Sequence, residues 1–378
     1  MWKKFLYKQK LIVYNRIMSK IYSNEKGQDR AIMCYACFDT REDVEMKMSE
    51  LKSLICANDM QVCGEIVQNI KQPDLSFLIG VGKLEELKRL VEKENAQIVV
   101  FQNELTGSKM NNLEQYLGVK VIDRTMLILD IFAQRATSSE GKLQVSLAQL
   151  KYSLPRLNGL NSSKNRYGGG VGMRGPGETQ LELDRRKVEK QIIAKQKELD
   201  IVKQNRELRR KQRIMSNQKT VALVGYTNSG KSTIMNVITK SDVFVKDMLF
   251  ATLDTTTRKV YLNENHTILL SDTVGFVSDL NHELVDAFKS TLEESLNADL
   301  LLNVVDISDP EAVKKEKITL DVLSELGVDL KKVVTVYNKI DKIHPVVDEN
   351  AIQISAKMNV NIDKLKDFII KYFDDLKK

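Results

Sequence analysis

An octapeptide at residues 225–232 constrains the fold of this chain more than any other feature. It consists of Gly225, Tyr226, Thr227, Asn228, Ser229, Gly230, Lys231 and Ser232. It fits the pattern G-x-x-x-x-G-K-[ST], follows an apolar, strand-like run at 221–224, and precedes a helix-like segment at 233–239. This context predicts a phosphate-binding loop, whose backbone N–H groups and following helix N-terminus face a β-phosphate. We expect Lys231 to reach the β- and γ-phosphates and the Ser232 hydroxyl to bind Mg²⁺. An ordinary glycine-rich turn is the alternative, and the flanking strand and helix disfavour it.

A second motif indicates which base the nucleotide carries. The strand-like run 333–337 is followed by Asn338, Lys339, Ile340 and Asp341. A buried Asp341 carboxylate can accept hydrogen bonds from guanine N1–H and the exocyclic amine, a donor pair that adenine lacks. We expect Asn338 to hold N7 and to tie this segment to the phosphate loop, and the stem of Lys339 to cover the base. A backbone N–H of the tripeptide after the strand-like run 351–354 can donate to guanine O6. That tripeptide is Ser355, Ala356 and Lys357.

Two further segments have sequences suited to contact a γ-phosphate. One ends the apolar stretch 267–270 and consists of Asp272, Thr273, Val274 and Gly275. Asp272 is expected to hold Mg²⁺ through water, and the Gly275 N–H to sense the γ-phosphate. The other lies in a threonine-rich loop and consists of Phe250, Ala251, Thr252, Leu253 and Asp254. Thr252 is the expected second hydroxyl ligand of Mg²⁺, although Thr255, Thr256 and Thr257 compete on chemistry alone. Two such loops can order around Mg²⁺ and a γ-phosphate and relax after hydrolysis.

The residues expected to catalyse hydrolysis are less complete than those expected to bind the nucleotide. We expect Lys231, Thr252 and Gly275 to act in hydrolysis, but the next residue is Phe276, where many small GTPases carry a water-orienting Gln. Phenylalanine cannot orient water, so we predict slow intrinsic hydrolysis and a partner that completes the site. Asn228 suggests one addition, because in related GTPases an Asn at this place helps to hold K⁺ beside the phosphates. K⁺ is therefore a second cofactor hypothesis beside Mg²⁺.

Composition bounds the class and the compartment. With 378 residues, 42% hydrophobic and 29% charged, the chain fits a soluble protein of two or more domains. Its net charge of +7 permits a polyanionic partner, and no apolar run approaches the roughly 18 residues of a membrane span. Four cysteines suggest a reducing cytoplasm. Cys34 and Cys37 form C-x-x-C, which we interpret as two buried thiols in a strand. We expect a cytoplasmic monomer, with partial membrane association left open.

Upstream of the nucleotide motifs the pattern changes twice. Between 30 and 123, apolar runs at 31–38, 76–79, 98–101 and 119–122 alternate with helical patterns such as 83–93, which predicts a mainly parallel sheet. Gly80 to Lys83 resembles a fragment of a nucleotide loop, but a helix-start turn is the better interpretation. Residues 124–157 are helical in pattern, and 167–177 are rich in glycine. That segment is either a linker or a loop that orders on RNA.

A long polar helix is predicted from 179 to 213, as the second half of a helical hairpin with 137–157. Its basic residues outnumber its acidic ones and favour contact with RNA over a solvated charged face. They are Arg185, Arg186, Lys187, Lys190, Lys195, Lys197, Lys203, Arg206, Arg209, Arg210, Lys211 and Arg213. The predicted fold is α/β: a P-loop GTPase domain preceded by a small α/β domain with a long helical hairpin. The expected boundaries are a basic extension at 1–29, the small domain at 30–123, the hairpin at 124–216 and the GTP-binding domain at 217–378.

Residues 30–378 resemble the HflX family of ribosome-associated GTPases. The resemblance rests on D-R-T at 123–125, L-D-I-F-A-Q-R-A at 129–136, E-G-K-L-Q-V at 140–145 and R-G-P-G-E-T-Q-L-E at 174–182. The loops at 249–254 and 272–276 also match. It implies hydrolysis of GTP to GDP and phosphate, binding to the large ribosomal subunit and its rRNA, stimulation by the ribosome, and a role in ribosome splitting, rescue or subunit maturation.

Some features depart from the family, and other readings compete. The 1–26 extension and Asn281-His282 are unlike it, and a C-terminal domain found in some members is missing. One alternative is an RNA-binding assembly factor that uses GTP as a structural switch with little turnover. Another is a tRNA-modifying or Obg/Era-type GTPase, disfavoured because the chain lacks a KH-like GxxG module and a C-terminal cysteine motif.

Overall fold

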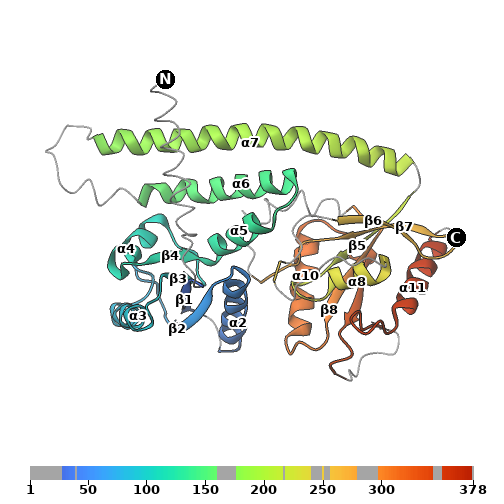
Figure 1. The fold of residues 1–378 in the computed structure, drawn as a ribbon, viewed down its shortest axis with the longest axis horizontal. Coiled ribbons are helices and arrows are strands. Elements are labelled where there is room, and N and C mark those ends of the chain that lie inside the picture. Colours follow the sequence, from blue (N-terminus) through green and yellow to red (C-terminus); the bar gives the residue numbers. More distant parts are fainter. Residues whose placement is uncertain are drawn as a thin grey trace.

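The computed structural model describes residues 28–38, 41–159, 176–215, 218–239, 249–250, 256–278, 297–343 and 351–376. Two α/β units lie side by side beneath one long helix (Figure 1). The first unit contains a sheet of order β2-β1-β3-β4 in which every strand pair is parallel, as predicted. Its strands are β1 (Arg30–Cys37), β2 (Gln61–Asn69), β3 (Ile98–Phe101) and β4 (Lys120–Asp123).

Helices cover both faces of this first sheet. They are α2 (Arg41–Ala57), α3 (Val81–Glu94), α4 (Gly107–Leu117) and α5 (Arg124–Arg135). Gly80 is the N-cap of α3, which confirms the helix-start interpretation of that glycine-rich segment. Cys34 and Cys37 are both buried within β1, as expected, and burial raises the pKa of the Cys34 thiol.

One predicted strand is wrong. Residues 76–79 form a turn, because the Asp74 side chain accepts hydrogen bonds from the backbone N–H groups of Ser76 and Phe77, and Leu78 has φ +72°. The strand in this part of the sheet is β2, which lies at the sheet edge. Its sequence is polar and half-buried, so it lacks the apolar pattern by which a strand is predicted. Leu78 and Ile79 are buried in the hydrophobic cluster beneath α3 without belonging to a strand.

The predicted helical hairpin is present. It comprises α6 (Ser139–Ser153), which continues into the 3₁₀ turn η1 (Leu154–Gly159), and the 40-residue α7 (Pro176–Met215). The two helices run antiparallel (Figure 1), and Val188 and Leu199 of α7 are buried although most of its other described side chains are exposed or half-buried. Pro176 stands at the first helical position, where its missing N–H costs nothing. The glycine-rich stretch up to Gly175 lies outside the described residues.

The second unit contains a six-stranded sheet of order β10-β9-β8-β5-β7-β6, parallel except for β6. The strands are β5 (Lys219–Val224), β6 (Thr256–Tyr261), β7 (Thr267–Asp272), β8 (Leu300–Asp306), β9 (Val333–Asn338) and β10 (Ile352–Gln353). The helical elements are α8 (Lys231–Thr239), α10 (Ala312–Glu325), the 3₁₀ turn η3 (Leu330–Lys332) and α11 (Ile362–Asp375). Within the described residues, no helix combines the length and the apolar character needed to cross a membrane.

The two units share one hydrophobic cluster. Phe132 of α5 meets Phe250 edge-on, with ring centroids 4.6 Å apart, and Phe276 is buried in the same cluster. A separate cluster fills the other face of the second sheet, beneath α8 and α11. The first unit therefore packs directly against two segments that carry the predicted γ-phosphate motifs.

Candidate functional site

At two positions in the loop between β5 and α8, the backbone conformation and the close neighbours allow only glycine. Gly225 has φ +140°, and a Cβ there would lie 2.3 Å from the carbonyl oxygen of Val304. Gly230 has φ +98°, and its Cβ would lie 2.2 Å from Nδ2 of Asn338. Other residues reach these φ values only with strain, and a Cβ would also clash. The predicted loop thus exists, and α8 begins immediately after it at Lys231.

Lys231 lies buried in the curve of the loop. Its Nζ donates to the carbonyl oxygens of Gly225, at 3.0 Å, and Tyr226, at 2.8 Å. Burial lowers the pKa of Lys231 to about 8, and the nearby Asp272 carboxylate acts in the opposite direction. An ammonium held here costs desolvation energy that a bound anion would offset.

Ser232 and Asp272 meet beside this lysine. The Ser232 hydroxyl donates to Oδ2 of Asp272 at 2.6 Å, and Oδ1 of Asp272 accepts the Thr273 backbone N–H at 3.0 Å. A hydroxyl and a carboxylate are hard oxygen donors of the kind that Mg²⁺ binds together with water and phosphate oxygens. The described residues contain no cluster of three or more His, Cys, Asp or Glu suited to a metal. Thr252, with residues 251 and 253–254, lies outside the described residues.

The Asn338 side chain joins three segments. Its Nδ2 donates to the Ser229 carbonyl at 2.9 Å, and its Oδ1 accepts the Ala356 N–H at 3.0 Å. The expected tie to the loop is therefore present, and it extends to the tripeptide that begins at Ser355. Lys339, at φ +68°, donates to the Asn228 carbonyl at 2.9 Å and pairs with Asp306 at 2.7 Å.

Asp341 differs from its expected setting. Its carboxylate is exposed rather than buried, because the residue lies in the surface turn after β9. A hydrogen bond from the Ser355 hydroxyl is the main cause that lowers its pKa, so the carboxylate stays ionised and orients toward the tripeptide. Ile340 and Lys357 lie in the same two turns.

The Asp272–Gly275 segment continues into a close backbone pairing with the loop. The Phe276 N–H donates to the Gly225 carbonyl at 3.0 Å, and the Thr227 N–H donates to the Phe276 carbonyl at 2.8 Å. A Cβ on Gly275 would lie 2.7 Å from Cα of Thr227 and 2.9 Å from Nζ of Lys231. The Phe276 ring itself is buried in the shared hydrophobic cluster, which agrees with its inability to position water.

A buried polar cluster at the junction of the two units was not expected from the sequence. Arg124 of α5 donates to Glu50 of α2 at 3.0 Å and to the Ser278 carbonyl at 2.6 Å. The Tyr226 hydroxyl donates to Glu50 at 3.1 Å and accepts the Ser278 N–H at 2.7 Å. The available signal was a charged residue on a helix face that is otherwise apolar, as for Glu50 beside Leu51 and Leu54. This cluster fixes the first unit against the loop and the segment after Gly275.

The fold and these segments together define a GTP-binding protein of the phosphate-loop class. Comparison with known proteins agrees along the chain. Residues 45–133 match the family described as "GTP-binding GTPase N-terminal", residues 135–213 match "GTP-binding GTPase Middle Region", and residues 220–339 match "50S ribosome-binding GTPase".

Two relatives are similar to the chain over most of its length. The GTPase HflX of Caldanaerobacter subterraneus subsp. tengcongensis is 48% identical over 346 residues, covering 91% of this chain and 80% of the relative. The GTPase HflX of Escherichia coli K12 is 40% identical over 346 residues, covering 89% and 81%. The chain belongs to the HflX family, and it is a GTPase.

Two solved structures show the same architecture. One is a complex of SsGBP with GDP, which is 25% identical with a TM-score of 0.51 and covers 93% of this chain and all of that one. The other is a GTP-binding protein from the archaeon Sulfolobus solfataricus in complex with GDP, with 26% identity, a TM-score of 0.50 and coverage of 92% and 100%.

Proposed function

We propose that GTP binds across the carboxyl edge of the second sheet, with its phosphates in the loop 225–232 and its guanine against Asn338, Asp341 and the tripeptide 355–357. The observation that carries this is the Asn338 side chain, which bonds both the loop and the guanine-side tripeptide. The buried Lys231 ammonium supplies positive charge for the β- and γ-phosphates. Asp341 accepts the guanine donors, and its lowered pKa keeps it an acceptor.

Mg²⁺ is the metal that this donor set fits. Ser232 would bind it directly and Asp272 through water, with Thr252 as the further hydroxyl ligand. P-loop GTPases generally use Mg²⁺, and the metal supplies charge neutralisation at the phosphates. Ser232→Ala removes one protein ligand, and chelation of Mg²⁺ removes the metal. Both changes should weaken GTP binding more than GDP binding, which fluorescent-nucleotide titrations of the two can measure.

Hydrolysis is slow in the isolated protein and is completed by a partner. The support is Phe276, whose ring is buried in the core and whose backbone is paired with the loop. The ribosome is that partner, through the large subunit and its rRNA, and the work of the cycle is ribosome splitting, rescue or subunit maturation in the cytoplasm. The family description "50S ribosome-binding GTPase" supports the large subunit in particular.

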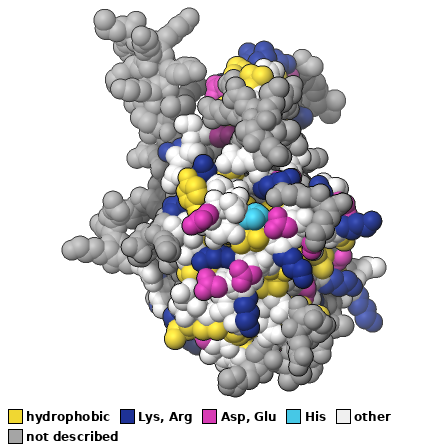
Figure 2. All heavy atoms as spheres, turned by 90° about the vertical axis from the view of Figure 1, so that its right-hand side faces the viewer, with side chains coloured by type: hydrophobic (Ala, Val, Ile, Leu, Met, Phe, Trp, Pro, Cys, Tyr) yellow, Lys and Arg dark blue, Asp and Glu magenta, His cyan; other side chains and the backbone are white. Residues whose placement is uncertain are grey.

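The charge of α7 supports contact with RNA at a limited set of positions. Three of its basic side chains, Arg185, Arg186 and Lys187, form salt bridges with acidic residues one turn away. Lys190, Lys195 and Lys197 have no such partner among the described side chains. By contrast, acidic and basic side chains are interspersed on the face of the second unit in Figure 2, so that the part drawn in colour shows no broad patch of one sign.

Sedimentation with ribosomal subunits tests this proposal. The protein should migrate with the large subunit when a GTP analogue is bound and leave it with GDP. Equal migration with both subunits, whichever nucleotide is bound, would contradict the proposal. The competing function, an assembly factor with little turnover, predicts one round of hydrolysis per protein even with subunits present. Multiple-turnover kinetics with and without large subunits therefore separate the two functions.

K⁺ beside the phosphates is a second cofactor proposal. Asn228 has φ +61°, and its backbone carbonyl accepts from Lys339. Exchange of Na⁺ for K⁺ should raise the hydrolysis rate severalfold, and Asn228→Ala should remove the difference. Equal rates in the two salts would contradict it.

A further inference from the structure

The backbone of Gly275 and Phe276 lies directly against the phosphate loop. The Phe276 N–H donates to the Gly225 carbonyl and its carbonyl accepts from the Thr227 N–H, so this segment is paired with the loop like an added strand. A Cβ on Gly275 would lie 2.9 Å from Nζ of Lys231, the ammonium expected to reach the β- and γ-phosphates. A γ-phosphate bound to that ammonium needs the same space. GTP must therefore displace the segment, whereas GDP ends one phosphate earlier.

Ser278, two residues after Phe276, holds this segment by three polar groups. Its N–H donates to the Tyr226 hydroxyl at 2.7 Å, its carbonyl accepts from Arg124 at 2.6 Å, and its hydroxyl donates to Glu50. Ser278 is 5% exposed, so water does not compete for these bonds. Hydrogen bonds to charged groups are roughly twice as strong as those between neutral groups. The bonds from Arg124 and to Glu50 are of that kind.

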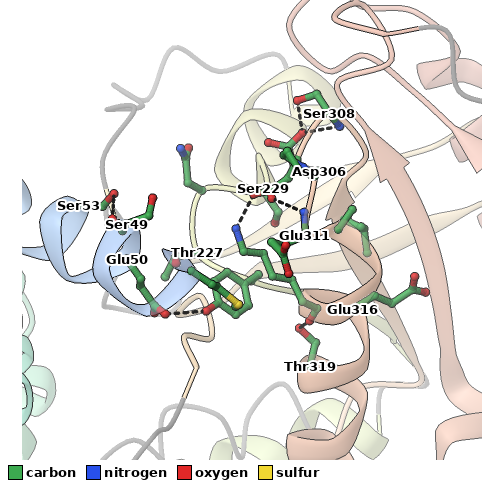
Figure 3. A pocket seen from close by; sticks show the side chains of 18 of the residues that line it. Ser49, Glu50, Ser53, Thr227, Ser229, Asp306, Ser308, Glu311, Glu316 and Thr319 are labelled. Carbon is green, nitrogen blue, oxygen red and sulfur yellow. Dashed lines mark hydrogen bonds and ion pairs between the residues drawn. The ribbon is translucent and has the colours of Figure 1, made fainter. Parts of the chain in front are cut away.

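Both charged partners of Ser278 belong to the first unit. Glu50 of α2 and Arg124 of α5 form an ion pair at 3.0 Å, with side chains only 7% and 6% exposed. Figure 3 shows Glu50 reaching from α2 to the phosphate loop, where its carboxylate accepts from the Tyr226 hydroxyl at 3.1 Å. Moving Ser278 away takes a hydrogen-bond partner from each of two buried charges, which is costly.

Packing transmits this restraint from Ser278 to Gly275. The two residues between them, Phe276 and Val277, are 2% and 0% exposed and belong to the hydrophobic cluster that the two units share. Both are therefore fixed by their side chains, and a displacement of Gly275 by the width of a phosphate disturbs the whole segment as far as Ser278.

We propose that Arg124 and Glu50 are positioning residues that make the isolated protein prefer GDP to GTP. By holding Ser278 they keep Gly275 and Phe276 in the space of the γ-phosphate, and GTP binds only at the cost of breaking that arrangement. A ligand shifts such an equilibrium only by its different affinity for the two arrangements, and only the γ-phosphate supplies that difference. This role rests on the GTP site proposed above, but it does not depend on the ribosome.

Displacement of a fluorescent nucleotide by GDP and by a non-hydrolysable GTP analogue, with Mg²⁺ present, tests the proposal on the full chain. The measured quantity is the ratio of the two affinities. Arg124→Gln should shift the ratio toward the GTP analogue by at least about tenfold, the loss expected for one hydrogen bond to a charged group, with GDP affinity within threefold of the original. Arg124→Lys keeps a cation and should give a smaller shift. Arg30→Gln is the matched control, because it breaks the Arg30–Glu94 ion pair within the first unit and should leave the ratio unchanged.

The ratio separates positioning from a structural role. A junction that only stabilises the protein would lower the urea midpoint of Arg124→Gln and leave the ratio unchanged, and that result would overturn the proposal, as would an equal loss of both affinities. If Arg124→Gln does not fold, Ser278→Ala removes only the hydroxyl bonded to Glu50 and should shift the ratio about threefold in the same direction. Failure of the original protein to bind either nucleotide would instead contradict the GTP site itself.

Discussion

The two α/β units build the carboxyl edges of their parallel sheets in opposite ways. In the first unit, Asp123 at the end of β4 is fully buried and accepts from the Tyr152 hydroxyl at 2.6 Å and from two backbone N–H groups. In the second unit, Lys231, Ser232 and Asp272 gather around a loop whose glycines pack directly against Val304 and Asn338. Both edges therefore satisfy their polar groups by internal hydrogen bonds, and the second differs in that an ammonium, a hydroxyl and a carboxylate lie together at a glycine-containing loop.

The glycine-rich segments make the same contrast. Gly80 has φ −68° and ψ 155°, an extended conformation open to any residue, and a Cβ on Gly82 would have nothing within 4 Å. Gly225 and Gly230 need positive φ and zero side-chain volume. Glycine therefore indicates a ligand site only where the backbone or a close neighbour requires it.

The largest effect should follow a Cβ placed in the second loop. Gly230→Ala combines strain at φ +98° with a clash against Asn338. Together these should weaken GDP binding by at least about 100-fold, or ~3 kcal/mol. Gly82→Ala is the matched control and should leave GDP affinity unchanged. Fluorescent-GDP titration measures both, and a Gly230→Ala protein that binds within threefold of the original would break the contrast.

The buried carboxylate of the first unit should matter for stability instead. Tyr152→Phe removes the hydroxyl that donates to Asp123 and should lower the free energy of unfolding by about 1–3 kcal/mol. Urea denaturation measures this loss. GDP affinity of the folded variant should be unchanged. A variant with full stability and weakened GDP binding would mean that the first edge also serves the nucleotide.

The pKa of Lys231 predicts a pH dependence. Burial holds the pKa at about 8, below the ordinary 10.5, so the charged lysine lowers stability up to about pH 8, and that cost is relieved as pH rises toward 10.5. Nucleotide binding needs the ammonium, so GDP affinity should fall by up to about fivefold between pH 8 and pH 9. Lys231→Met should bind weakly and lose this dependence. An identical pH profile in the variant would assign the effect to another group.

The sequence predicted those parts of the site that consist of short motifs placed directly after a strand. The loop 225–232, the Asp272–Gly275 segment and Asn338 each follow a strand end, so the parallel sheet brings them to one edge. β2 was missed because an edge strand with Gly64, Glu65 and Gln68 has no apolar pattern. The Glu50 and Arg124 cluster was missed because it joins residues that lie far apart in sequence, with Glu50 and Ser278 separated by 228 positions. The sequence around Glu50 or Arg124 gives no pattern that predicts a contact over such a separation.

The central claim, that the second edge recognises guanine through Asp341, is tested most directly by Asp341→Asn. An amide in place of the carboxylate offers a donor to the 2-oxo group of xanthine and lacks the second acceptor for guanine. Competition between GDP and xanthosine diphosphate, measured by displacement of a fluorescent nucleotide, reports the preference. The original protein should prefer GDP, and the variant should prefer the xanthine nucleotide by at least about tenfold. Retained preference for GDP in a folded variant would contradict the account.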